Sequence, residues 1–199
     1  MRGICGTIWT GYLNILRYGG KIIAKPEEYV KYAIGREHKM STILADDLRV
    51  QYDKAFETVG GIIEAFPEDK WLVPHGDEYY IPCRIAYHIA VFIDGMVADG
   101  FKDPDFRAKV PFGDWKIGTA ETLPDKSALA AYYKEVIGRA KNVLAALDDD
   151  AVTAMQAPEM SRFGTTKIGA HMMTMRELSA HTGELNKMLI ENGQDDIWR

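Results

Sequence analysis

Four segments of the chain repeat apolar residues with the period of an α-helix. They cover residues 41–66, 81–99, 126–147 and 166–191. Charged and polar residues fill the positions between the apolar ones, which is typical of helices with one buried face. No segment shows the convincing alternation of a strand. The pattern therefore predicts four amphipathic helices, each on the order of 30 Å long.

Residues at the ends of these segments support the same helices. Pro67 follows the first segment and is expected to end it. Gly100 is the expected C-terminal cap of the second helix, and Asp125 the expected N-terminal cap of the third. Asp148–Asp150 are expected to close the third helix, and Gly193 to stop the fourth.

Four such helices predict an all-α protein with the architecture of a four-helix bundle. The links cover residues 67–80, 100–125 and 148–165, and each is long enough for a hairpin or a crossover. The middle link is rich in proline and glycine and is the expected crossover. Helix periodicity alone leaves the connectivity open.

Composition narrows the classes of function. The chain has 199 residues and a net charge of −5, which argues for one domain and against nucleic acid or an anionic membrane as a partner. No apolar run is long enough to cross a bilayer. Cys5 and Cys83 are the only cysteines, so we expect no disulfide framework and a cytoplasmic protein.

The first 39 residues differ in charge from the rest of the chain. They carry seven Lys or Arg and three Glu, whereas residues 40–199 carry seventeen Lys or Arg and twenty-six acids. The N-terminal segment also lacks a helical or strand period. We therefore expect residues 1–39 to be an extension outside the domain of residues 40–199, and Met40 to be the natural start of translation.

His88 and His181 interrupt apolar stripes on the second and fourth predicted helices. His88 lies between Ile85 and Ile89, and His181 lies between Leu178 and Leu185. An imidazole in a core must have its ring nitrogens satisfied, usually by a backbone carbonyl or a hydroxyl. Two such imidazoles on two helices could instead share one metal ion.

Glu177 adds a third candidate ligand to this pair. It precedes His181 by four residues, so the two side chains share one side of a helix and could reach a common ion. A hydrogen bond from His181 to this glutamate is the alternative, and it would leave a pocket without metal. The pattern by itself does not decide between them.

The order of these features resembles the DinB-like family of helical bundles over about residues 41–199. The resemblance rests on short motifs in a fixed order. They are Phe66-Pro67-Glu68 at the end of a long first helix, Trp71 shortly after it, His88 on the second helix, and His181-Thr182-Gly183-Glu184-Leu185 on the last.

This resemblance implies an up-down-down-up bundle with a crossover between its second and third helices. It also implies a metal site with one histidine on the second helix and two on the fourth. His88 and His181 match two of these positions, while Glu177 stands at the third. Two histidines and one carboxylate suit a divalent transition metal such as Zn²⁺, Ni²⁺ or Fe²⁺ and leave coordination positions open.

Two functions follow from the resemblance as expectations. The first is a metal-dependent transferase or isomerase that uses a small thiol cofactor, in which the metal lowers the pKa of a bound thiol or water. The second is a non-enzymatic, stress-related binding or dimerising module with a vestigial metal site, which the substitution of Glu177 for histidine favours. A homodimer is compatible with both.

Other polar residues are weaker candidates. His171 is out of phase with His181 on a regular helix, so joint ligation is not expected. Glu184 is a hydrogen-bond partner of His181, a general base at the rim of a pocket, or a surface residue. We expect Asp94 to be a surface charge and Cys83 to pack structurally, although a helix N-terminus can lower a thiol pKa. Trp115 and other aromatic residues of the links are expected at the mouth of a pocket.

Overall fold

The computed structural model describes residues 17–18, 21–22 and 42–198. The chain divides into two units, Met1–Ser41 and Thr42–Arg199. In the first unit, the strands β1 (Arg17–Tyr18) and β2 (Lys21–Ile22) pair antiparallel, with Arg17 opposite Ile22. Nearly all of residues 1–39 lie outside the described residues. Their status as an extension, and Met40 as the natural start of translation, therefore stay predictions.

Residues 42–198 are helical, which confirms the predicted all-α class for this unit. Each of the four predicted segments contains one long helix, and two short helices occur in the links. The helices are α3 (Ile43–Ala65), α4 (Pro82–Met96), α5 (Phe106–Lys109), α6 (Lys126–Ala145), α7 (Asp149–Thr153) and α8 (Lys167–Glu191). Short 3₁₀ helices cover Glu68–Lys70, Gly100–Lys102 and Pro158–Phe163.

Side-chain caps set the starts of two long helices. The Asp125 carboxylate accepts a hydrogen bond from the backbone N–H of Ala128 at 2.8 Å and begins α6, as the sequence predicted. The Thr166 hydroxyl accepts one from the backbone N–H of Gly169 at 3.4 Å and begins α8. After α8, Gly193 adopts a φ of +80°, a left-handed conformation that ends helices well.

Two predicted helix ends were wrong. α4 stops at Met96, and the left-handed residue that follows is Asp99, with a φ of 63°, rather than Gly100. Gly100 is instead needed for space, because a Cβ there would lie 2.5 Å from the ring of Phe106. Asp148 begins the short helix α7 by accepting a hydrogen bond from Ala151, so the acidic run does not simply close α6.

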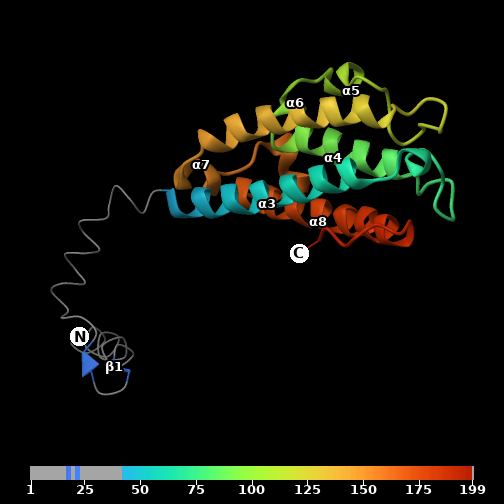
Figure 1. Ribbon diagram of the computed structural model, residues 1–199. Helices are drawn as coiled ribbons and strands as arrows, with labels where there is room; N and C mark the ends of the chain where they lie inside the picture. The colour runs from blue at the N-terminus through green and yellow to red at the C-terminus, as the bar shows by residue number, and fades with distance from the viewer. Residues whose placement is uncertain (1–16, 19–20, 23–41, 199) are drawn as a thin grey trace, which may run out of the picture. The chain divides into compact units, whose positions relative to one another are not determined.

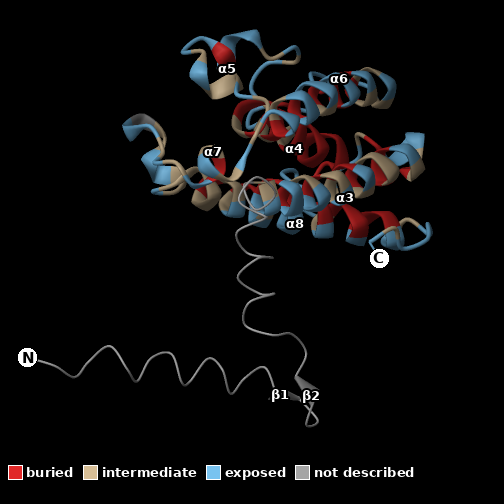
Figure 2. Ribbon diagram, turned by 90° about the vertical axis from the view of Figure 1, so that its left-hand side faces the viewer, coloured by how far each residue is buried: buried red, intermediate tan, exposed pale blue. Residues whose placement is uncertain are grey.

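The four long helices lie side by side (Figure 1). α4 packs against α6 and α8, and α3 packs against the same two helices. The buried residues of all four face one another, and exposed residues cover the outside (Figure 2). The core sits between them and has the largest buried side chains, including Trp71, Tyr52 and Tyr87.

Hydrogen bonds show which helix ends meet. The Lys126 ammonium, at the start of α6, donates to the carbonyl of Phe66, just after the end of α3, at 2.8 Å. The Cys83 thiol, at the start of α4, donates to the carbonyl of Pro124, just before α6, at 3.2 Å. The start of α6 therefore contacts both the end of α3 and the start of α4.

A second set of contacts relates α8 to its neighbours. The Tyr52 hydroxyl, in the first half of α3, lies 3.0 Å from Nδ1 of His171, in the first half of α8. His88, in the first half of α4, packs against His181, in the second half of α8.

Within the described residues, no helix is both long and apolar enough to cross a membrane.

Asp94 of α4 is buried, so the prediction of a surface charge was wrong. Its residue is 8% exposed, and its carboxylate accepts hydrogen bonds from the Tyr132 hydroxyl at 2.9 Å and from the Arg139 guanidinium at 2.9 Å. Both partners belong to α6, which covers this side of α4. Periodicity read on one helix could not show that a second helix would cover it.

We predict that Asp94→Ala lowers the free energy of unfolding by about 2 kcal/mol, because it leaves a buried hydroxyl and a guanidinium without their acceptor. Asp53→Ala is the matched control, since Asp53 pairs with Lys141 of α6 at 2.9 Å but both side chains are about half exposed. The control should change stability by less than about 0.5 kcal/mol. Urea unfolding measures both, and equal losses in the two variants would contradict the role of burial.

Candidate metal centre

The predicted ligands His88, Glu177 and His181 lie together between α4 and α8. Each offers one ligand atom, and these atoms lie within 4.8 Å of one another. The centroids of the His88 and His181 rings are 4.6 Å apart, and the ring planes are nearly perpendicular, at 87°. All three residues are partly buried. The structure thus brings together the residues that the sequence singled out, and metal binding by them stays a prediction.

The α8 side of this cluster is organised by helical spacing. Glu177, His181 and Glu184 succeed one another by about one turn and share one face of the helix. Nδ1 of His181 lies 2.7 Å from a Glu184 carboxylate oxygen, and Nε2 lies 3.8 Å from a Glu177 oxygen. A carboxylate accepts, so Nδ1–H donates to Glu184, and Nε2 is the nitrogen that faces Glu177.

Glu184 is therefore a hydrogen-bond partner of His181, one of the roles that the sequence left open for it. The separation between Nε2 of His181 and Glu177 is too long for a hydrogen bond. Glu177 Oε1 also lies 3.7 Å from the guanidinium of Arg176, its neighbour in sequence. The Glu177 carboxylate is thus held beside His181 without being hydrogen-bonded to it.

His88 has a different environment. Its Nδ1 atom is buried and has no hydrogen-bond partner among the described residues. The ring stacks obliquely on Trp115, with centroids 3.9 Å apart, and packs against Phe92. Burial, then the neighbouring His181 and Lys116, lower its pKa to about 4. The ring is therefore neutral at pH 7, which is the form of histidine that binds metal ions.

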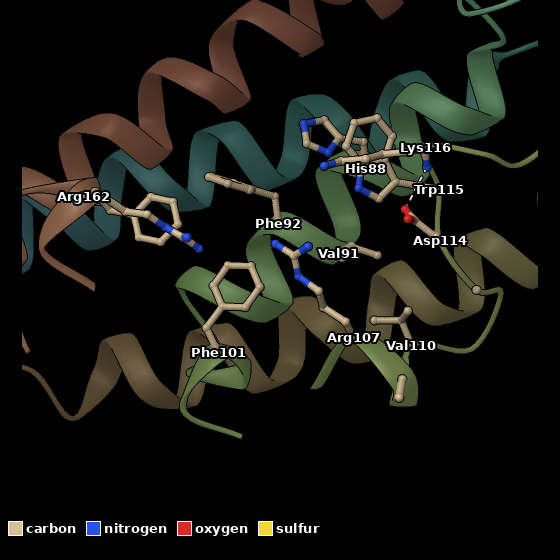
Figure 3. A pocket seen from close by; sticks show the side chains of 13 residues that line it. His88, Val91, Phe92, Phe101, Arg107, Val110, Asp114, Trp115, Lys116 and Arg162 are labelled. Atoms are coloured by element: carbon tan, nitrogen blue, oxygen red, sulfur yellow. Dashed lines mark hydrogen bonds between the residues drawn. The ribbon is translucent and has the colours of Figure 1, made fainter. Parts of the chain in front are cut away.

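A cavity of about 490 Å³ opens beside His88 (Figure 3). Its walls come from α4, from the link that follows α4, and from the 3₁₀ helix Pro158–Phe163. Trp115 lies at the cavity, as predicted for an aromatic residue of the links. The link 67–80, which the sequence also placed there, contributes no described residue to the lining, and its Trp71 is buried in the core against Phe66.

His171 lies apart from the cluster, as its phase on the helix predicted. The Tyr52 hydroxyl is 3.0 Å from its Nδ1, and the ring packs edge-on against Tyr52. Burial lowers its pKa to about 4, while Asp99 raises it and Lys167 lowers it further. His171 is therefore a hydrogen-bonded core histidine.

Cys83 and His75 also lie outside the cluster. Cys83 is buried and donates to the Pro124 carbonyl, and burial raises its pKa to about 12, which rules out the reactive thiolate that a helix N-terminus can produce. His75 lies in the link before α4, where Nε2 contacts the Glu191 carboxylate at the end of α8. Cys83 packs structurally, as predicted.

The sequence did not identify three cationic residues at the cavity, Arg107, Lys116 and Arg162. They belong to links, where no apolar period indicates which way a side chain points. The only signal in the sequence was their proximity to aromatic residues, since Lys116 follows Trp115 and Arg162 precedes Phe163.

No protein-family model, curated protein or solved structure matches this chain. The resemblance to the DinB-like family stays a prediction.

The low pKa of His171 predicts an acid-dependent loss of stability. The folded pKa, about 4, lies below the ordinary value of 6.5, so the unfolded chain takes up a proton that the folded chain does not. The stability present above pH 6.5 is therefore lost as the pH falls toward 4, by about 3 kcal/mol for this residue.

His171→Asn keeps an acceptor near the position of Nδ1 but cannot take up this proton. We expect the variant to lose about 2 to 3 kcal/mol less than the unchanged protein between pH 7 and pH 4, measured by urea unfolding at several pH values. Parallel stability curves for the two proteins would show that His171 does not titrate in this range.

Proposed function

We propose that this protein binds a divalent transition metal through His88, Glu177 and His181. The observation that carries the proposal is the meeting of three ligand atoms from two helices within 4.8 Å. The lack of any partner for the buried Nδ1 of His88 among the described residues adds to it, because the ring keeps a nitrogen available for a ligand.

The residues present fit such an ion. Two imidazole nitrogens and one carboxylate oxygen form a donor set that suits Zn²⁺, Ni²⁺ or Fe²⁺. Two ligands on a tetrahedral ion are about 3.4 Å apart when each bond is about 2.1 Å long. The observed separations reach 4.8 Å, so small rotations of the side chains suffice. Glu184 fixes the His181 ring in the orientation that such a site requires.

We further propose that the helices form an up-down-down-up bundle with the crossover between α4 and α6. The contacts of the helix ends support it, because the start of α6 meets the end of α3 and the start of α4. This gives α6 the direction of α4 and the opposite direction to α3. The first half of α8 contacts the first half of α3, and the second half of α8 contacts the first half of α4. These contacts support an α8 that runs parallel to α3 and antiparallel to α4.

This topology and ligand set support membership of the DinB-like family, and with it a metal-dependent transferase or isomerase that uses a small thiol. When bound, the metal would lower the pKa of a thiol or water that binds to it. The chain's own part is to hold the ligands, to orient His181 through Glu184, and to cover His88 with Trp115. The buried, unpaired Cys83 supports a cytoplasmic location.

One observation favours the alternative function of a non-enzymatic binding or dimerising module. Glu177 lies within 3.8 Å of His181, so a modest rotation would let the two pair directly and leave no ligand set. A protein of this kind would keep the helices and the cavity but hold no metal. The metal content of the purified protein separates the two proposals.

We predict that the protein, purified without an affinity tag, contains about one equivalent of a transition metal per chain, because three ligands converge on one point. His88→Ala and His181→Ala should each lose the metal. Glu177→Gln should weaken binding less, because an amide oxygen is a poorer but usable ligand. Elemental analysis measures all three variants.

His75→Ala is the matched control for this experiment. His75 pairs with a glutamate, as His181 does, but it lies outside the cluster, so its loss should leave the metal content unchanged. A stoichiometric metal that survives His88→Ala or His181→Ala would place the site elsewhere. Circular dichroism checks that each variant keeps its helices.

The thiol proposal makes a spectroscopic prediction. Three protein ligands leave open positions on the ion, and soft sulfur binds borderline ions well. Titration of the cobalt-substituted protein with a small thiol should therefore produce an intense near-ultraviolet charge-transfer band. The spectrum should not change on addition of the corresponding alcohol. If several cellular thiols leave the cobalt spectrum unchanged, the transferase proposal fails and the binding module is favoured.

A further inference from the structure

The cavity beside His88 carries three cationic side chains. Arg107 comes from α5, Lys116 from the link that follows it, and Arg162 from the 3₁₀ helix Pro158–Phe163. Figure 3 shows the guanidinium groups of Arg107 and Arg162 directed toward the same space, between the rings of Phe92 and Phe101. Side chains from separate segments of the chain thus bring positive charge to one place.

Among the side chains that the structure describes, no carboxylate forms an ion pair with Arg107, Lys116 or Arg162. Asp114 is the one acid among the described side chains that line the cavity, and it accepts a hydrogen bond from the backbone N–H of Lys116 at 3.0 Å. Three like charges around a hollow lined with apolar groups produce a positive potential that attracts an anion.

Aromatic rings form much of the remaining surface. Phe101 and Phe163 stack with planes at 2°, and the Arg162 guanidinium lies over the Phe163 ring at 4.5 Å. Phe92 and Trp115 line the part next to His88, and both rings pack against its imidazole. The cavity therefore combines flat apolar walls with three exposed cations. This combination suits a ligand that has a flat apolar body and a charged group.

We propose that this cavity binds a small aromatic carboxylate. Arg107 and Arg162 would hold its carboxylate, and its ring would lie along Phe92 and Trp115 toward His88. The proposal rests on the proposed function, because it names the substrate class of the same site. Guanidinium groups favour it, since their planar donors match the two oxygens of a carboxylate.

The size and charge of the cavity limit the ligand. A volume of about 490 Å³ lies toward the lower end of the range for small-molecule pockets, roughly 300–1,000 Å³. One or two fused rings with a carboxylate fit this space. Asp114 at its edge disfavours a ligand with many negative charges.

The test uses three probes and calorimetric titration of the full chain. The probes are 2-naphthoate, its neutral counterpart 2-naphthamide, and acetate, which has the charge without the flat body. We expect 2-naphthoate to bind at least about tenfold more tightly than either of the other two, because only it satisfies both the cations and the rings. Its affinity should also fall as salt is added, since the cations are exposed.

The double variant R107Q/R162Q should lower the affinity for 2-naphthoate by at least about tenfold and leave that for 2-naphthamide nearly unchanged. The matched control is K134Q/K141Q, which also removes two positive charges, from exposed positions on α6. A second control, K134Q, removes one. Both controls should bind 2-naphthoate within about twofold of the unchanged protein. The arginines are exposed, so the helical content of the double variant should be retained.

Equal affinities for 2-naphthoate and 2-naphthamide, or an unchanged affinity in R107Q/R162Q, would overturn the carboxylate site. Metal content is measured on the same samples, and R107Q/R162Q should keep it, since neither arginine is a candidate ligand. If the protein contains metal but its affinity for 2-naphthoate does not depend on the arginines, the carboxylate site is refuted and the metal proposal is not. Arginine-dependent binding without metal refutes the metal proposal and leaves the carboxylate site standing.

Discussion

The burial of α4 is the constraint on which the rest of the structure depends. Twelve of its fifteen residues are buried, and several of these carry polar groups. A polar group that loses water must find a partner in the protein, or the fold loses stability. Asp94 finds Tyr132 and Arg139 on α6. The position of α6 beside α4 is therefore fixed by hydrogen bonds as well as by apolar packing.

The same requirement places the link between α4 and α6. Arg84 donates to the carbonyl of Gly118, and the Tyr87 hydroxyl donates to the carbonyl of Gly113 at 2.9 Å. Trp115 lies between these two attachment points in the sequence, and the link lays its ring on His88. His88 does not share this pattern, because its ring makes no hydrogen bond to the link and its buried Nδ1 has no partner among the described residues. Arg84 and Tyr87, which are close to His88 on α4, thus hold the link whose Trp115 covers His88.

Helical periodicity predicted the long helices and allowed His88 to meet Glu177 and His181, since residues on the inward faces of packed helices come together. The resemblance to the DinB-like family implied that these three residues share one site. Periodicity could not predict the burial of Asp94, because that depends on which helix covers the other side of α4. Nor could it predict Arg107 and Arg162, which belong to links without a period and are directed by tertiary contacts. The prediction of Gly100 as a helix cap was wrong for a similar reason. Glycine is required there by the lack of space beside Phe106, and Asp99 is the residue that adopts the left-handed conformation. Local pattern determines the helices, and contacts between distant segments determine the cavity.

The charges around His88 fall on two sides. Glu177 and Glu184 lie on the α8 side, whereas Arg107, Lys116 and Arg162 lie at the cavity, and His88 belongs to both the cluster and the cavity. Because the pKa of His88 is about 4, its ring is neutral at pH 7 and adds no charge to either side. A cation held on the first side and an anion held on the second would therefore attract each other across a neutral ring. Such an attraction is reciprocal: whatever factor the cation adds to the affinity for the anion, the anion adds to the affinity for the cation. A site arranged in this way would hold its metal most tightly when its substrate is bound.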